Sequence, residues 1–111
     1  MAITEEQVEK ALDYLRESSI PASVVRAQAR TLKKYVEVVE AEQVSLQGGG
    51  MTHAQALMVA RASKEYRTAL DGWQKAVEED CRFTMLREAA DARIQAWRTE
   101  QATNRAMERV R

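Results

Sequence analysis

The segment Gly48-Gly49-Gly50-Met51-Thr52-His53-Ala54-Gln55 divides this 111-residue chain into two helical parts. Three successive glycines permit left-handed backbone angles and a sharp reversal, so they end one helix. Thr52 followed three residues later by Gln55 is a capping-box pattern, which begins the next helix. Beyond Thr52 there is no proline and only one glycine, Gly72. We therefore predict a helical hairpin whose second arm is one very long helix over residues 52–110.

The residues before the glycines predict two further helices, separated near Pro21. Thr4 and Gln7 form another capping-box pattern, which predicts a short helix over residues 4–18. Pro21 disfavours helical geometry in the residue before it and is tolerated in a first turn, so a second helix should cover residues 21–47. Apolar residues recur along that helix at steps of three and four, close to a heptad seam, at Val25, Ala29, Leu32, Val36 and Val39.

The composition indicates an all-α protein, taken here as a single domain over residues 1–111. Helix-forming residues dominate, strand signals are missing, and 17 basic residues balance 17 acidic ones. No apolar stretch approaches the roughly 20 residues needed to span a bilayer, so we expect no membrane segment. The N-terminus lacks a basic region followed by an apolar one, and the single Cys81 suits a reducing compartment. We therefore expect a cytoplasmic location.

The length of the last predicted helix suggests self-association. The helix over residues 21–47 can cover only its first half, so the remainder, from about residue 79, carries apolar side chains without a partner unless the short first helix covers part of them. Leaving them in water is unfavourable by roughly 25 cal/mol per Å². We therefore expect a coiled-coil-like homo-oligomer. Gly72 is the expected kink in this helix, although a continuous helix is favoured over two separate ones. The predicted oligomer seam comprises Leu70, Trp73, Val77, Leu86, Ala90 and Ile94.

No motif in the sequence predicts catalysis. His53 and Cys81 are 28 positions apart without further metal-ligand or nucleophile patterns around them. We expect His53 to be exposed or adjacent to a helix cap, and Cys81 to be a small core or seam residue. The carboxylates fit a solvated helix face, and a pair such as Arg87 with Asp91 suits ion pairing at i,i+4. We accordingly predict a non-enzymatic protein with no metal, cofactor or small-molecule substrate.

The charge pattern of the C-terminal segment leaves two interpretations open. Residues 93–111 hold five arginines against two glutamates, and Trp97 lies between Arg93 and Arg98. Arginine, amides and an aromatic ring suit single-stranded nucleic acid, but the same residues fit a coiled-coil seam with charged flanks. The predicted nucleic-acid or partner contacts are Arg93, Trp97, Arg98, Gln101, Asn104, Arg105 and Arg109. A second basic group, interpreted as a solvated face unless both groups line one groove, comprises Arg26, Arg30, Lys33 and Lys34.

The stretch ARIQAWRTEQATNRAM, residues 92–107, resembles the C-terminal signature of small helical proteins of tailed bacteriophages and prophages. The stretch QVEKALDYL, residues 7–15, is similar to the start of such proteins. The resemblance implies a phage accessory protein in a bacterial host cell, acting beside recombination or replication proteins. Two hypotheses follow. The chain self-assembles and binds single-stranded DNA or a recombination protein, or it is a pure protein-interaction or scaffolding module.

Overall fold

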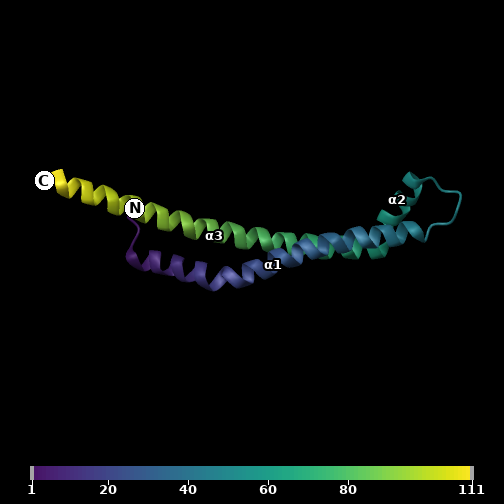
Figure 1. Ribbon diagram of the computed structural model, residues 1–111, viewed down its shortest axis with the longest axis horizontal. Helices are drawn as coiled ribbons and strands as arrows, with labels where there is room; N and C mark the ends of the chain where they lie inside the picture. The colour runs from purple at the N-terminus through teal and green to yellow at the C-terminus, as the bar shows by residue number, and fades with distance from the viewer. Residues whose placement is uncertain (1, 111) are drawn as a thin grey trace. The chain divides into compact units, whose positions relative to one another are not determined.

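The protein is all-α (Figure 1). The computed structural model describes residues 2–110, and about nine-tenths of them lie in three helices. Helix α1 spans Glu5–Ser45, α2 spans His53–Ala62 and α3 spans Lys64–Val110. The prediction of an all-α fold with a very long C-terminal helix is therefore confirmed. Between residues 2 and 110, no helix is long and apolar enough to cross a bilayer.

Both predicted capping boxes form. The Gln7 backbone N–H donates to Thr4 Oγ1 at 3.2 Å, and the Thr4 N–H donates to Gln7 Oε1 at 3.0 Å. Thr52 and Gln55 exchange the same two hydrogen bonds at the start of α2. In the loop before α2, Gly50 has φ +109°, a backbone conformation that only glycine adopts without strain. Local sequence signals therefore determine where these two helices begin.

Helix α1 runs through Pro21, so the predicted separation into helices over 4–18 and 21–47 is wrong. An internal proline removes one helical hydrogen bond and costs about 3 kcal/mol. Burial on both sides of the proline offsets that cost. Val8 and Ala11 are buried before it, and Val25 and Ala29 are buried after it. Tertiary packing thus overrides the local preference to end the helix.

The second correction concerns Ser63, which divides the helix predicted over residues 52–110. Its ψ of 152° is extended, and its hydroxyl donates to the Ala60 carbonyl at 2.6 Å. The same Oγ accepts the Tyr66 backbone N–H at 3.2 Å, which is the bond of a helix N-cap. The sequence contains the signal for this helix start, because Ser63 is a capping residue and Glu65 places an acidic side chain in the first turn of α3. From there α3 continues without interruption through Gly72, and a bend at that residue stays a prediction.

The contacts group the chain into two compact units, and the single domain over residues 1–111 stays a prediction. The terminal unit contains residues 2–22 and 81–110, and the central unit contains residues 23–80. In the terminal unit, the start of α1 lies antiparallel to the end of α3 (Figure 1). The Ile3 backbone N–H donates to the Glu100 carboxylate at 3.1 Å. The buried core of this unit comprises Val8, Ala11, Ala90 and Ile94.

The central unit joins the rest of α1 to α2 and the start of α3. Val36 and Val39 of α1 are buried with Ala69 of α3, and Tyr66, Leu70 and Trp73 pack against them. Arg26 Nε lies 3.3 Å from Asp80 Oδ1, which links α1 to α3. Arg61 Nε lies 2.9 Å from Glu40 Oε2, which links α2 to α1.

This arrangement corrects the expectation of an uncovered C-terminal half of α3. Because α1 is a single 41-residue helix, its N-terminal part covers that half within the same chain. Ala90 and Ile94, predicted as oligomer seam, therefore lie in the core of the terminal unit. Leu70 and Trp73 likewise pack in the central unit, whereas Val77 and Leu86 are 37% and 51% exposed. The predicted overhang cannot support self-association.

Replacing Ile94 by alanine should lower the free energy of unfolding by about 2–5 kcal/mol, because it leaves a cavity in the core of the terminal unit. Urea denaturation followed by circular dichroism at 222 nm measures the change. Leu86→Ala is the matched control, since Leu86 is 51% exposed and its replacement should cost well under half as much. Equal costs for the two variants would contradict the packing of α1 on α3.

Candidate interaction surfaces

Trp97 belongs to the core of the terminal unit. It is half-buried and packs against the cluster that contains Val8, Ala11 and Ile94. An indole in this position is not an open platform for base stacking. Trp97 packs against α1 of the same chain. It therefore lies in a seam between two helices, as one of the two interpretations predicted, but the seam is within one molecule.

The other predicted contact residues of α3 divide into two sides of the helix. Arg98, Arg105 and Arg109 are exposed and recur at intervals of seven and four, which places them on one side. Arg93 is exposed about 140° away around the helix axis, because five positions at about 100° each separate it from Arg98. Gln101 is half-buried, and its carbonyl accepts a hydrogen bond from Arg105 Nε at 3.4 Å. The structure therefore brings together three of the seven predicted contacts, while Asn104 is exposed apart from them.

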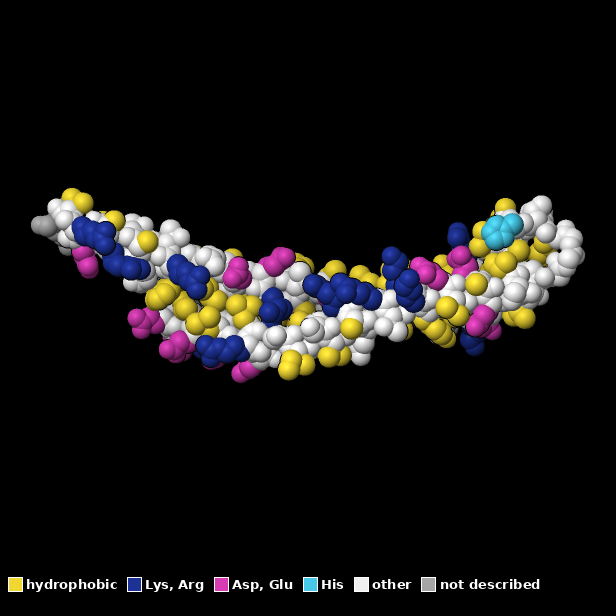
Figure 2. All heavy atoms as spheres, viewed as in Figure 1, with side chains coloured by type: hydrophobic (Ala, Val, Ile, Leu, Met, Phe, Trp, Pro, Cys, Tyr) yellow, Lys and Arg dark blue, Asp and Glu magenta, His cyan; other side chains and the backbone are white. Residues whose placement is uncertain are grey.

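The charge of each unit is close to balanced. Among the described residues, the terminal unit has eight basic and nine acidic side chains, and the central unit has eight of each. Figure 2 shows Lys and Arg side chains interspersed with Asp and Glu along the visible face. Nucleic-acid binding draws on a surplus of positive charge on one face. Arg98, Arg105 and Arg109 therefore form a local basic group in a unit that has no overall surplus of positive charge.

The second basic group lies on α1 in the central unit. Arg26, Arg30, Lys33 and Lys34 are all exposed. Arg26 also pairs with Asp80 across to α3. This group and the arginines of the α3 end belong to different units, so a groove shared by both stays a prediction.

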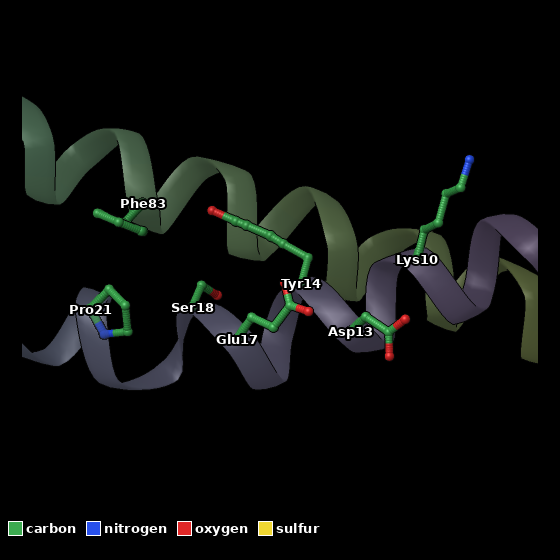
Figure 3. A pocket seen from close by; sticks show the side chains of 7 residues that line it. All are labelled: Lys10, Asp13, Tyr14, Glu17, Ser18, Pro21 and Phe83. Atoms are coloured by element: carbon green, nitrogen blue, oxygen red, sulfur yellow. The ribbon is translucent and has the colours of Figure 1, made fainter.

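The terminal unit has an open hollow of about 460 Å³ between its two helices (Figure 3). Phe83 of α3 and Tyr14 and Pro21 of α1 supply its apolar lining, and Lys10, Asp13 and Glu17 stand at its exposed edge. Figure 3 shows these charged groups pointing in different directions, so they do not converge on one point. The hollow has no arrangement that would hold a reacting group.

Buried Ser18 at the base of the hollow is bound by Arg87. One nitrogen of Arg87, Nη1, donates to Ser18 Oγ at 2.6 Å and to the Leu15 carbonyl at 2.8 Å. The i,i+4 pair of Arg87 with Asp91 that the sequence suggested is absent from the ion pairs of residues 2–110, because the guanidinium reaches across to α1. These two charge-assisted bonds help to fix α3 against α1.

The central unit has a groove of about 490 Å³ between α1 and α3. Leu32, Val39 and Ala69 form its apolar floor, and Lys64 and Glu65 stand at one end. A side chain in place of Gly72, which also lines the groove, would meet nothing within 4 Å. The glycine therefore leaves this part of the groove open rather than allowing a close helix contact.

His53 and Cys81 do not form a site. His53 is exposed beside the Thr52 cap, which confirms its predicted place, whereas Cys81 is exposed and not a core residue. Its exposure contradicts the core alternative, while a place in a seam between chains stays a prediction. Within residues 2–110, no three His, Cys, Asp or Glu side chains are grouped to hold a metal ion. The hydrogen bond to Glu40 raises the pKa of Arg61 above its ordinary value.

Comparisons with known protein families, with curated proteins and with solved structures found no significant match.

Replacing Trp97 by alanine should lower the free energy of unfolding by about 2–4 kcal/mol, somewhat less than for a fully buried tryptophan, because part of the residue is exposed. Arg98→Ala, the matched change at the next position, should alter it by less than about 0.5 kcal/mol. Urea denaturation of both variants gives the comparison. An unchanged stability for Trp97→Ala would place the indole outside the core.

Proposed function

We propose that this chain is a non-enzymatic helical module that self-associates through exposed helix faces. The observation that carries the proposal is its accessible surface of 8585 Å². A folded monomer of 12.6 kDa is expected to expose about 6,200 Å². The surplus of about 2,400 Å² exceeds the ~800 Å² that one partner contributes to a standard protein interface.

The small core of the chain supports the same proposal. Six of the eleven buried apolar residues are alanines, and no large side chain is fully buried among the described residues. Alanine contributes little apolar area, so each unit gains only modest stability from its own core. Many large apolar side chains remain exposed, among them Ile20, Val24, Tyr35, Val38, Leu46, Met58 and Met85. Association that covers some of them would add stability that the single chain lacks.

A second candidate function is single-stranded DNA binding through Arg98, Arg105 and Arg109. Their exposure on one side of α3 favours it, and the resemblance to phage proteins implies recombination or replication partners. Three arginines can neutralise about three phosphates, which predicts a slope of log affinity against log salt near −2 for a single strand. The near-balanced charge of the terminal unit makes protein association the stronger proposal.

Size-exclusion chromatography with light scattering on the full chain tests both functions. At micromolar concentrations we expect a mass that is a multiple of 12.6 kDa, because association buries part of the surplus surface. A mass of 12.6 kDa up to several hundred micromolar would overturn the proposed self-association.

The same run with a labelled single-stranded oligonucleotide at low salt tests the second function. Co-elution that is lost in a variant with Arg98, Arg105 and Arg109 all changed to alanine would support DNA binding through α3. A triple variant with Arg16, Lys75 and Arg67 changed to alanine removes the same charge elsewhere and serves as the control. A protein that elutes without the oligonucleotide even at low salt would exclude the DNA hypothesis.

A further inference from the structure

We infer that the occupant of the exposed face of α1 in the central unit is a second copy of the same chain, lying antiparallel to the first. This inference rests on the proposed self-association and deepens it by assigning a surface, a partner and an orientation. The surface is defined as the outer face of α1, and it comprises Val24, Ala27, Thr31, Lys34, Val38 and Ala41.

The outer face has the spacing of a helix-pairing seam. Its residues follow one another at alternate steps of three and four, the pattern with which two helices interlock side chains. All six residues are exposed, and Val24 and Val38 are 48% and 52% exposed. The buried residues of the same segment, including Val25, Val36 and Val39, lie on the opposite side, toward α3. Helix α1 therefore has a second stripe with helix-pairing spacing, apolar at both ends with Thr31 and Lys34 between them, which its own chain leaves exposed.

The charges beside the outer face identify the partner and its direction. On this side of the helix Arg30 and Lys34 are followed by Glu37 and Glu42, whereas Glu40 lies on the other side and pairs with Arg61 of α2. A parallel second copy would place like charges together. An antiparallel copy places the basic half of one helix beside the acidic half of the other, which is the complementarity that sets orientation in paired helices. A segment that holds both halves is complementary to itself.

One register satisfies both the seam and the charges. With Thr31 opposite Lys34 of the second copy, Val38 meets Ala27 and Val24 meets Ala41 across the interface. In an antiparallel pair the residues that flank the seam then bring Arg30 beside Glu37 of the second copy. The two-fold symmetry of such a contact produces this ion pair twice. Arg30 and Glu37 form no ion pair in the described part of the single chain, so both are available.

Side-chain size also suits this register. Each valine of the outer face meets an alanine, so large and small side chains alternate and the two helix backbones can approach closely. Lys34 opposite Thr31 can lay its aliphatic stem over the seam and keep its ammonium group in water. The outer face spans 18 residues, or about 27 Å of helix. The surplus surface of about 2,400 Å² per chain leaves ample area for this contact.

Charge reversal at the two flanking positions tests the inference. Arg30→Glu and Glu37→Arg, each alone, convert two attractive pairs into two repulsive ones, so the dimer dissociation constant should rise about tenfold or more. The double variant R30E/E37R restores opposite charges and should return the constant to within about threefold of the native value. Sedimentation equilibrium of the full chain measures all of these constants. Arg67→Glu, an exposed arginine on α3, is the matched control and should have no effect.

Disulfide trapping tests the orientation independently. Thr31→Cys and Lys34→Cys are made as separate proteins, each with Cys81→Ser so that no other thiol is present. In the antiparallel register the two engineered thiols face each other, so a mixture should form the mixed disulfide faster than either protein alone forms its own. Faster formation of the two self-disulfides would show a parallel contact and would overturn the inference.

The outcomes separate the inference from the proposed function. A native oligomer whose dissociation constant ignores both single reversals would overturn the outer face as the contact and leave self-association standing. A native protein that remains a single chain at every concentration would overturn both. Single reversals that weaken the dimer, followed by recovery in the double variant, support the inference, because a merely structural effect of either change would not be cancelled by the other.

Discussion

The contact between two antiparallel helices is the constraint on which the rest of this structure depends. A helix in such a pair buries one narrow stripe against its partner, and its other sides remain in water. The stripes of α1 and α3 are built from alanine, valine and one isoleucine, so the cores are thin. A chain of this mass that forms a second layer of helices would bury larger side chains. Here the exposed side of α1 has the same residue spacing as a buried side, and this uncovered stripe points to a partner helix.

The parts of the fold that the sequence predicts correctly are local. A capping box needs only four residues, and both boxes formed where the sequence placed them. The glycine reversal is equally local, since a positive φ requires no distant contact. Pro21 shows that local sequence signals alone do not determine every helix end. Its cost of about 3 kcal/mol is a local property, but it is offset by buried residues on either side of it. Packing of that kind depends on α3, which no window around Pro21 contains.

The incorrectly predicted helix break at Pro21 also affected the prediction for the candidate site. With a break at Pro21, only a short separate helix was left to cover the C-terminal half of α3, so Trp97 could be interpreted either as a seam residue or as a nucleic-acid contact. With α1 continuous, the same tryptophan packs against Val8 and Ala11. The arginines were less affected, because a charged side chain on the solvent side of a helix stays exposed in either arrangement. Exposure of Arg98 and Arg105 was therefore predictable, whereas the environment of Trp97 depended on distant residues.

Two stripes on one helix explain why the periodicity of α1 gave an incomplete prediction. The pattern Val25, Ala29, Val36 and Val39 was recognised as a seam, and the structure buries these residues within the chain. A second pattern, from Val24 to Ala41, alternates the same steps of three and four on the opposite side of the helix. It has Thr31 and Lys34 at its centre, whereas the first stripe is apolar throughout, so the sequence favours the first as the buried one. In the structure α3 presents Ala69 to the first stripe and leaves the second exposed. Val24 and Val38 are 48% and 52% exposed on the second stripe, and an antiparallel second copy would cover each with an alanine. The charges that flank this stripe are complementary to themselves in that same orientation, so spacing and charge point to one contact.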